Sequence, residues 1–490
     1  MPASNEGLTL ASKEGLTLAS NEGVTLGSNE GVTLGSTDDL TCFKAYDVRG
    51  RLGRDFDPAI AARIAAGFAG VLAADRVVLG RDCRASSPAI ADAVAAALQG
   101  AAIQVLDLGL CGTEEVYFAT HHLKASGGIM VTASHNPPDY NGLKLVQADA
   151  APLSPDQFAG VRGWAESHAA PEHAPTAPRT SCAGTRAEYV TRVIGFIDPA
   201  RLRPLHILVN AGNGAAGPTF DAIAERLAAL GAPLRFTRMH HAPDPAFPNG
   251  IPNPLLAENQ PATARAVQAA GADFGVAWDG DFDRCFLFDH LGRFVPGEYV
   301  VGLLAAAFLA REPGAVIVHD PRVVMNTRDI VAQGGGRAVM ARTGHAFAKQ
   351  ALRDSGAVYG GEISAHHYFR DFACCDSGMI PWLLVAEMLS RSGTRLADLL
   401  DARLARFPSS GEVNFAVADP AAAMARVVGH FADDAPCRDD LDGTSLEWPD
   451  WRFNLRLSNT EPLLRLNVET RGDTALLAAR LGEISAMLVA

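Results

Sequence analysis

The sequence predicts an α/β protein of several domains. From Leu40 onward, apolar β-branched stretches alternate with Ala-rich stretches of helical periodicity. A length of 490 residues corresponds to roughly three domains at ~150 residues each. Hydrophobic residues make up 48% of the chain and charged residues 20%, so a large core is possible and disorder cannot dominate. Alternating strands and helices favour helices layered on largely parallel sheets.

The N-terminal residues 1–39 differ from the rest of the chain. Four copies of an eight-residue repeat run from Ser4: SNEGLTLA, SKEGLTLA, SNEGVTLG and SNEGVTLG. The period is far shorter than that of a solenoid, and each copy has too few aliphatic side chains to bury a core. We therefore expect a disordered repeat tail, with β-type self-association of the aliphatic triplets as the alternative.

The expected elements after the tail follow from local sequence. Arg76–Asp82 (RVVLGRD) is expected to be a buried strand ending in a turn, with Ser87 capping the next helix and Pro88 in its first position. Leu205–Gly214 (LHILVNAGNG) begins a second unit of strand, turn and helix. Further buried strands are expected in IQVLDLG, GGIMV, FGVAW and AVIVHD.

Three loop-rich segments divide the region after the tail into four parts. These segments are His168–Gly184, Leu287–Glu298 and Leu404–Phe415. We therefore place the domains at residues 40–184, 185–293, 294–405 and 406–490. The last part lacks a regular alternation of strands and helices, so we expect it to be α+β.

Composition argues against several classes of protein. Lys and Arg total 42 against 55 Asp and Glu, a formal charge of −13, which disfavours a nucleic-acid-binding protein. Eight cysteines without a CxxC pair indicate reduced thiols in a cytoplasmic protein rather than a disulfide scaffold. No apolar run approaches the ~18–20 residues of a membrane span, and no secretory signal is visible. We expect neither nucleic acid nor membrane as a partner.

The first chemical motif is TASHNPPDYNGLKL, Thr132–Leu145. Ser134 and His135 follow an expected strand, and two prolines that cannot continue a sheet should hold the loop rigid and exposed. A nucleophilic or phosphorylated serine needs that exposure. No GxSxG elbow is present, which disfavours an α/β-hydrolase. Read alone, such a loop more often has a structural role.

The second motif is DGDFDR, Asp279–Arg284, which follows the apolar strand FGVAW. Three carboxylates at alternate positions can converge on one point, where a cation would offset their mutual repulsion. Oxygen ligands favour Mg²⁺ over zinc. The spacing does not fit an EF-hand, because Arg284 stands where its glycine would be. A solvated acidic turn is the alternative.

Two further loops carry polar side chains suited to a sugar phosphate. In GGEISAHHYFRD, residues 360–371, the side chains suited to sugar hydroxyls are Glu362, Ser364, His366 and His367. Zinc is disfavoured there because adjacent histidines lack the HExxH spacing, and packing is the alternative. In RLSNTEPLLRL, residues 456–466, the anion donors are Arg456, Ser458, Asn459, Thr460 and Arg465. Surface salt bridges are the alternative for this loop.

A literal GxGxxG match, Gly212–Gly217, does not indicate a dinucleotide site. The acidic residue expected about 20 residues further on is missing, since the sequence there reads LRFTRMHHAP. We interpret these glycines as tight strand–helix packing. Smaller segments favour anion handling, although each alone is more often structural: Lys44, Tyr46 and Arg49; Arg81 and Arg84; and His345.

Together the loops describe Mg²⁺-assisted phosphoryl transfer involving a phosphorylated small polyol. In this order, TASHNP, DGDFDR, GE-x-S-x-H and R-x-SNTEP resemble the α-D-phosphohexomutase superfamily, and within it the bacterial phosphomannomutases, over nearly all of Leu40–Ala490. The resemblance implies a heart-shaped architecture of three topologically similar α/β domains with mixed sheets and a smaller α+β domain. It implies interconversion of mannose 1-phosphate and mannose 6-phosphate, with some phosphoglucomutase activity.

The resemblance also implies a role for each motif. Ser134 would carry the phosphoryl group and bind Mg²⁺ together with Asp279, Asp281 and Asp283, and a hexose 1,6-bisphosphate would be both intermediate and activator. The residues that act on the reacting groups would be His135, Lys144, Arg49 and Arg284. The residues that hold the phosphohexose would be Lys44, Tyr46, Arg284, His345, Glu362, Ser364, His366, Arg456, Ser458, Asn459, Thr460 and Arg465.

One departure from the family pattern concerns the sugar loop. It reads GEISAHH where many members have GEMSGH, and Ala365 in place of glycine restricts the backbone. Glu362 and Ser364 are retained, so we expect the family's hexose selection. For the quaternary structure we expect a monomer or a weak homo-oligomer. A Mg²⁺-dependent sugar phosphatase and a non-catalytic sugar-phosphate-binding protein remain the alternatives.

Overall fold

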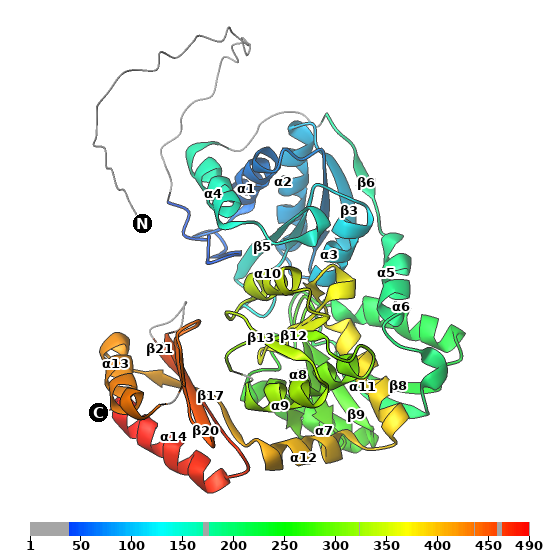
Figure 1. The fold of residues 1–490 in the computed structure, drawn as a ribbon. Helices are drawn as coiled ribbons and strands as arrows, with labels where there is room; N and C mark the ends of the chain where they lie inside the picture. The colour runs from blue at the N-terminus through cyan, green and yellow to red at the C-terminus, as the bar shows by residue number, and fades with distance from the viewer. Residues whose placement is uncertain (1–38, 170–175, 323, 436, 458–462, 490) are drawn as a thin grey trace, which may run out of the picture.

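The computed structural model describes residues 39–169, 176–322, 324–435, 437–457 and 463–489. These residues form four sheets, and each sheet with its helices is called here a domain, numbered I to IV along the chain (Figure 1). The tail predicted for residues 1–39 lies outside the described residues, except for Asp39.

Domain I holds a six-stranded sheet in the order β1-β5-β4-β2-β3-β6. Its strands are β1 (Val48–Arg51), β2 (Arg76–Arg81), β3 (Gln104–Leu110), β4 (Gly127–Val131), β5 (Tyr140–Gln147) and β6 (Arg179–Ser181). Its helices are α1 (Pro58–Val71), α2 (Ser87–Gly100), α3 (Thr113–His122) and α4 (Pro155–Ser167). Helix α2 begins at Ser87 with Ser86 as its cap residue, one position earlier than predicted.

Domain II holds a five-stranded sheet in the order β11-β10-β9-β7-β8. Its strands are β7 (Leu205–Asn210), β8 (Leu234–Met239), β9 (Phe274–Trp278), β10 (Cys285–Asp289) and β11 (Phe294–Val295). Its helices are α5 (Thr185–Ile194), α6 (Ala216–Ala229) and α7 (Gln260–Ala270). The domain boundary placed at 293/294 lies inside the β10–β11 hairpin.

Domain III holds a sheet in the order β13-β12-β14-β15-β16. Its strands are β12 (Val316–His319), β13 (Arg337–Met340), β14 (Tyr359–Gly361), β15 (His367–Phe369) and β16 (Cys375–Asp376). Its helices are α8 (Gly297–Leu309), α9 (Met325–Gln333), α10 (His345–Ser355), α11 (Met379–Ser392) and α12 (Leu396–Arg406).

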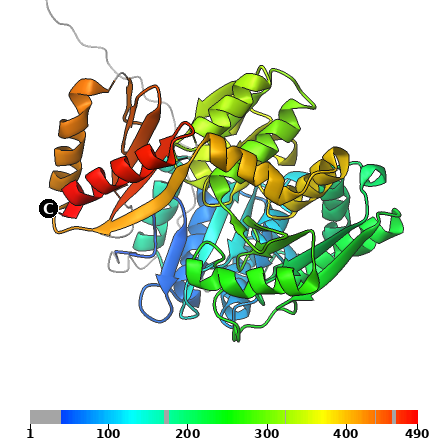
Figure 2. The ribbon, with the colours of Figure 1, turned by 90° about the horizontal axis from the view of Figure 1, so that it is seen from below.

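Domain IV is antiparallel throughout, in the order β17-β21-β20-β19-β18, consistent with the predicted α+β class. Its strands are β17 (Ser409–Ala416), β18 (Cys437–Asp439), β19 (Thr444–Glu447), β20 (Trp451–Leu457) and β21 (Leu463–Thr470). Helices α13 (Pro420–Phe431) and α14 (Thr474–Val489) pack on this sheet (Figure 2). Short 3₁₀ turns in the chain are η1 (Ala148–Ala150), η2 (Pro199–Arg201), η3 (Ala257–Asn259), η4 (Arg370–Phe372) and η5 (Ala432–Asp434).

The first three sheets are mixed rather than largely parallel. In each, parallel strands are followed by antiparallel ones: β4–β5 in domain I, β9–β10 in domain II and β14–β15 in domain III. The connections between these pairs are short, and a short connection can join only antiparallel strands. The three connecting loops contain Ser134, the DGDFDR motif and Glu362, so each sheet presents one polar loop of the predicted site.

Domains II and III share one core, to which domain I adds Tyr117, Val146 and Ala150. Domain I also has a core of its own, and domain IV has a separate one. Phe220 of α6 packs against Trp278 of β9 and Trp382 of α11, with ring centroids 5.8 and 5.7 Å apart. The core of domain IV is a separate cluster around Phe453 and Trp451. Figures 1 and 2 accordingly show domain IV, orange to red, to one side of the other three.

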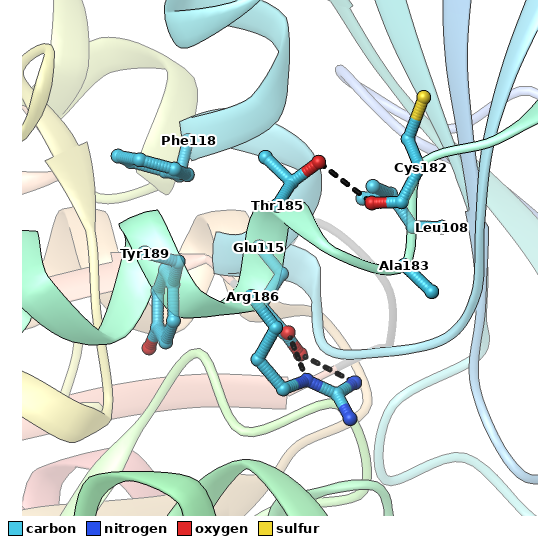
Figure 3. Close-up of a pocket in the computed structure, with 8 residues that line it drawn as sticks. All are labelled: Leu108, Glu115, Phe118, Cys182, Ala183, Thr185, Arg186 and Tyr189. Atoms are coloured by element: carbon cyan, nitrogen blue, oxygen red, sulfur yellow. Dashed lines mark hydrogen bonds and ion pairs between the residues drawn. The ribbon is translucent and has the colours of Figure 1, made fainter. Parts of the chain in front are cut away.

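Domains I and II meet where α3 lies beside α5. Arg186 Nε of α5 donates to Glu115 Oε1 of α3 at 2.7 Å, and Thr219 Oγ1 of α6 donates to Glu115 Oε2 at 2.9 Å. Figure 3 shows this ion pair beneath Thr185 and Cys182, next to the rings of Phe118 and Tyr189. The cavity that these residues enclose is only about 10 Å³, so the junction is closely packed.

Two sequence-based expectations concern the chain as a whole. All eight cysteines are unpaired, which confirms that the fold is not a disulfide scaffold. Among the residues that the structure describes, no helix has the length and apolar character needed to cross a bilayer.

Candidate active site

Loops from all four domains surround one cavity of about 840 Å³. The predicted residues that line it are Tyr46, Arg49, His135 and Lys144 of domain I, Arg284 of domain II, His345, Glu362, Ser364 and His366 of domain III, and Arg456 and Arg465 of domain IV. Ser458, Asn459 and Thr460 lie outside the described residues. Lys44 is not part of this lining: its exposed ammonium donates to Thr41 O at 2.9 Å.

Ser134 lies on the loop after β4, at the boundary between domains I and II. Its Oγ donates to Asp279 Oδ2 at 2.7 Å and lies 3.1 Å from His135 Nδ1. Its backbone is left-handed, with φ of 49°. The expectation that this serine is exposed was wrong, because it is only 1% exposed beneath the loop of domain II. Exposure on this loop falls instead on Pro137 and Pro138.

Arg84 holds the serine loop by its backbone. Its buried guanidinium donates to the carbonyl oxygens of Ser134 and Asn136 at 2.9 and 2.6 Å, and to those of Pro137 and Tyr140 at 2.8 and 3.1 Å. These four acceptors are neutral carbonyls of one loop, and the remaining Nε lies 3.4 Å from Asp82 Oδ2, so this arginine orients the serine loop and its charge is balanced within domain I. The GRDCR segment indicated a cation here, but the loop that it contacts could not be read from sequence.

Asp82 supports the same loop from below. Its carboxylate accepts hydrogen bonds from Thr132 Oγ1 at 2.8 Å and from Ser87 Oγ at 2.5 Å. The Thr132 hydroxyl oxygen in turn accepts from Ser134 N at 2.8 Å. A serine whose backbone is held from two sides has little freedom to move its Oγ, which suits a group that must meet a reacting atom.

The three aspartates of DGDFDR converge below the cavity. Asp279, Asp281 and Asp283 are 0–1% exposed and present carboxylate oxygens within 4.8 Å of one another. Lys144 Nζ donates to Asp281 Oδ2 at 2.8 Å and also to Asp283, and Thr113 Oγ1 donates to Asp281 Oδ2 at 2.6 Å. Within the described part of the chain, Asp281 Oδ1 and Asp283 Oδ1 are buried without a hydrogen-bond partner.

This donor set fits a hard divalent cation. Buried carboxylate oxygens without partners are costly unless a cation or donor satisfies them, and oxygen ligands suit Mg²⁺. Burial, together with the charges of Asp283 and Asp281, raises the pKa of Asp279 to about 7. A bound cation would oppose this shift, because it stabilises the ionised carboxylate.

Lys144 and His135 differ in protonation state in this environment. Burial by itself lowers the pKa of Lys144, but Asp281 and Asp283 outweigh it and raise the pKa above its usual value. Burial lowers the pKa of His135, and the charges of Arg284 and Arg49 lower it further. In this arrangement Lys144 is a charged donor and His135 a neutral imidazole, so His135 is the better proton acceptor of the two.

The domain I and II loops touch through glycine. A Cβ on Gly280 would lie 2.4 Å from Ser134 O, so no side chain fits between the two loops. The loop after β7 supports this contact from behind: Ala215 N donates to Gly280 O at 2.9 Å, and a Cβ on Gly214 would lie 2.8 Å from the same oxygen. Gly214 of GNGAAG therefore serves close packing, although against a loop and not between a strand and a helix as predicted.

The loop of Tyr46 and Asp47 reaches across the cavity to domain III. His345 Nε2 lies 3.2 Å from both carboxylate oxygens of Asp47, and the rings of Tyr46 and His345 are edge to face at 4.7 Å. On the same side, Arg49 Nη1 donates to Asn136 Oδ1 of the serine loop at 3.0 Å. Asp47 was not singled out from sequence, since one carboxylate in FKAYDVRG carries no distinguishing signal.

The sugar loop is braced within domain III. Glu362 Oε1 accepts from Gly344 N at 2.7 Å and Oε2 accepts from Tyr368 OH at 2.5 Å. His366 Nε2 accepts from Arg284 Nε at 3.1 Å, which connects this loop to the metal loop. Ala365 has a φ of 68°, a left-handed value that favours glycine, so the predicted backbone restriction falls on a strained residue.

Further buried charges lie behind His366. Its Nδ1 is 2.8 Å from Asp376 Oδ2, and Asp376 Oδ1 is 2.8 Å from Lys349 Nζ. The ammonium of Lys349 lies 3.7 Å from the ring centroid of Tyr117. Neither Asp376 nor Lys349 was predicted from sequence, because they lie in ordinary strand and helix patterns.

The phosphate-loop arginines lie beside an acid that the sequence did not indicate. Glu412 of β17 accepts from Arg456 Nη2 at 2.9 Å, and its Oε1 is 3.4 Å from Arg465 Nη1. Arg322 of domain III donates to the same carboxylate at 3.2 Å. The cavity is therefore acidic and metal-compatible at one end and rich in guanidinium groups at the other.

Family models match the chain in four consecutive segments. They describe phosphoglucomutase/phosphomannomutase domain I at residues 41–170, domain II at 187–292, domain III at 296–407 and the C-terminal domain at 412–486. Together they span most of the described residues, in the order in which the sheets occur.

Whole-chain comparisons agree with these models. The chain is 55% identical over 450 residues to a Xanthomonas campestris protein named phosphohexose mutases, covering 92% of this chain and 99% of the relative. It is 54% identical over 453 residues to a phosphomannomutase of Salmonella montevideo, covering 92% and 99%. An Escherichia coli phosphomannomutase is 53% identical over 443 residues, covering 90% and 97%.

Solved structures show the same fold. A phosphoglucomutase/phosphomannomutase family protein of Burkholderia thailandensis aligns with a TM-score of 0.79 and 32% identity, over 92% of this chain and 97% of that one. A Thermus thermophilus structure titled a putative phosphomannomutase has a TM-score of 0.76 at 22% identity, over 93% and 100%, and so supports the fold alone. With all four domain models matched in order, and relatives at 53–55% identity, this chain belongs to the phosphoglucomutase/phosphomannomutase family of intramolecular phosphotransferases.

Proposed function

We propose that this mutase interconverts mannose 1-phosphate and mannose 6-phosphate, with some activity on the glucose phosphates. The observation that carries the proposal is the meeting of Ser134 Oγ with Asp279, one of three buried carboxylates, at 2.7 Å beneath a cavity large enough for a phosphohexose. The names of the Salmonella and Escherichia coli relatives support mannose as the hexose.

In the proposed reaction Ser134 begins as phosphoserine. The bond between Ser134 Oγ and phosphorus breaks as the free sugar hydroxyl forms its own bond to that phosphorus. The sugar hydroxyl gives its proton to a base in the cavity, and Ser134 Oγ takes up a proton to become a hydroxyl again. The product is a hexose 1,6-bisphosphate. The intermediate then turns end for end, and its other phosphoryl group returns to Ser134. A bisphosphate added from outside would phosphorylate an enzyme that had lost its phosphoryl group, and so would act as an activator.

Asp279, Asp281 and Asp283 would hold Mg²⁺ beside the phosphoserine. When bound, the cation would offset the negative charge on the transferring group, the main requirement of phosphoryl transfer. Arg284 adds a fixed positive charge 3.5 Å from Asp279. His135, neutral and 3.1 Å from Ser134 Oγ, is placed to take the proton of the Ser134 hydroxyl when a phosphoryl group returns to it, because the sugar and serine oxygens lie on opposite sides of phosphorus during transfer. Lys144 is a charged donor among the neighbouring aspartates.

The far end of the cavity would hold the sugar and its second phosphate. Glu362, Ser364 and His345 face the cavity as acceptors and donors for hydroxyl groups. Arg456 and Arg465 would bind the phosphate that does not react. One anion site that can bind either phosphate explains how both orientations of the sugar are accepted, because the two phosphates exchange places when the intermediate turns and the site that binds the unreactive one is the same.

A coupled mutase assay tests the proposal. Mannose 1-phosphate and glucose 1-phosphate are assayed side by side with Mg²⁺ and a catalytic amount of glucose 1,6-bisphosphate, while inorganic phosphate release is followed in parallel. Isomerisation without phosphate release, faster with the mannose substrate, is the expected result. Phosphate release without isomerisation would replace the proposal with a sugar phosphatase, and binding without turnover would replace it with a sugar-phosphate-binding protein.

A further inference from the structure

Glu412 joins three guanidinium groups that face the cavity. Its Oε2 accepts from Arg322 Nη1 at 3.2 Å and from Arg456 Nη2 at 2.9 Å. Its Oε1 lies 3.4 Å from Arg465 Nη1. All four side chains line the same cavity, and the carboxylate is 21% exposed. The Glu412 carboxylate is thus surrounded by arginines as a bound anion would be, although it belongs to the chain itself.

The charges around Glu412 are already balanced, so they do not favour the binding of a second anion beside it. Arg322 also pairs with Asp320 at 2.6 Å and lies 3.9 Å from Glu362. Three guanidinium groups therefore face three carboxylates when Glu412 is in place. Burial by itself raises the pKa of Glu412, but Arg322 and Arg456 outweigh it and lower the pKa, so the group is ionised at neutral pH. A phosphate dianion entering beside it would gain no net attraction and would be repelled by Glu412.

A carboxylate and a phosphate monoester form the same kind of hydrogen bonds with an arginine. Both present paired oxygens to the planar guanidinium fork, and the phosphate carries the larger charge. We propose that Glu412 occupies, in the ligand-free enzyme, the site of the phosphate that does not react, and that this phosphate binds by exchange with the carboxylate. The inference rests on the proposed function, since it assigns Arg456 and Arg465 to that phosphate.

The exchange has a consequence for domain IV. Glu412 belongs to domain IV and Arg322 to domain III, so displacing the carboxylate breaks an ion pair between the two domains. Other links across this boundary remain, including Arg328 Nη1 to Glu447 Oε2 at 3.0 Å and Met325 N to Glu469 Oε1 at 3.0 Å. Domain IV has its own core, so losing one polar link changes its freedom to move without exposing apolar surface.

Inorganic phosphate is the probe for the exchange, and its Kd is measured by calorimetric titration of the full chain at pH 8, where phosphate is mostly dianionic. In the Glu412→Gln variant we expect a Kd about tenfold lower than in the wild type, because a like charge in the site is removed. The double variant Glu412→Gln with Arg456→Gln should lose this gain in phosphate affinity, which would show that the added phosphate binding occurs at Arg456. Glu412→Ala should show the same gain and guards against an effect peculiar to glutamine.

Glu447→Gln is the matched control. It also removes a carboxylate that links domain IV to an arginine of domain III, but Glu447 does not line the cavity. Its phosphate Kd should equal that of the wild type. An equal gain in Glu447→Gln would attribute the effect to a looser domain contact and overturn the exchange. An unchanged or weaker Kd in both Glu412 variants would overturn it as well, leaving Glu412 as a support for the arginines.

The titration does not depend on turnover. If the wild type failed to isomerise any hexose phosphate but the phosphate titrations gave the expected pattern, the proposed function would fall and the exchange would stand. If isomerisation were found and the Glu412 variants showed no gain, only the exchange would fall. Thermal unfolding of every variant establishes that each is folded before its Kd is compared.

Discussion

Ser134 Oγ and Asp279 Oδ2 lie 2.7 Å apart although 145 residues separate them along the chain. One belongs to the loop after β4 of domain I and the other to the loop after β9 of domain II. Each loop follows a strand that pairs in parallel with one neighbour and leads into an antiparallel strand. Two similar domains therefore present equivalent loops to each other. The proposed chemistry depends on this contact between domains.

Replacing the proposed nucleophile tests whether the phosphoryl group passes through it. Ser134→Ala should lower turnover by at least about 10³-fold, because no covalent intermediate can form. Intact mass should show one phosphoryl group on wild-type protein treated with glucose 1,6-bisphosphate and none on the variant. Ser355→Ala, on the exposed end of α10, is the control and should retain full activity. Near wild-type turnover in Ser134→Ala would remove this serine from the mechanism.

Separating the two loops by a single methyl group tests their close approach. In Gly280→Ala the new Cβ would meet Ser134 O at 2.4 Å, so the loops must move apart. A displacement of about 1 Å at a reacting group costs about 10²-fold in rate, and we expect kcat to fall by that amount. Gly163→Ala in α4 adds a Cβ that meets nothing within 4 Å and should leave kcat unchanged. Equal kcat in both variants would mean that the loops' separation does not govern the reaction.

Metal binding should appear as a gain in stability. The buried oxygens of Asp281 and Asp283 that lack a hydrogen-bond partner would bind a divalent cation only when folding brings them together. Mg²⁺ at ~100 times its Kd should therefore stabilise the folded protein by about 2.7 kcal/mol, seen as a rise in apparent Tm. Asp283→Asn should abolish the rise, whereas Asp398→Asn, at an exposed position, should keep it. A rise that survives in Asp283→Asn would place the cation elsewhere.

Glu298 should make stability fall as pH rises. Burial raises the pKa of this carboxyl, in the first turn of α8, from 4.5 to about 7. Between these values the unfolded chain releases the proton while the folded chain keeps it, so folding becomes less favourable up to about pH 7. The loss between pH 5 and pH 8 amounts to about 2 kcal/mol. Throughout this range, burial in the folded protein disfavours the ionised form of Glu298.

The Glu298→Gln variant measures this effect. Its apparent Tm should exceed that of the wild type by more at pH 8 than at pH 5, because glutamine has no proton to lose. Glu225→Gln, at an exposed position of α6, should show the same small difference at both values. A gain for Glu298→Gln that does not change with pH would show that the carboxyl is not the source.

The chemistry of the site could be predicted because it resides in short segments. Three aspartates at alternate positions after an apolar strand indicate a cation site wherever the strand is placed, and the same holds for arginines around a polar turn. Secondary structure is equally local: the periodicity of Arg76–Asp82 and of the segment from Ser87 predicted a strand and a helix that the structure contains. The α+β character of domain IV was predicted from its lack of alternation, whereas the direction of its strands was not.

What could not be predicted depends on contacts between residues far apart in sequence. The burial of Ser134 and the place of Lys144 among the aspartates arise where domain I meets domain II. The contact of Arg84 with the serine loop lies within domain I but joins residues about 50 positions apart. Lys44, chosen for its charge, lies outside the cavity, whereas Glu412 and Arg322, neither of which was singled out from sequence, line it. Residue type and spacing determine what a loop can bind, because they act within a few residues. Which loops face one another is set by the packing of whole sheets, and no local pattern records that packing.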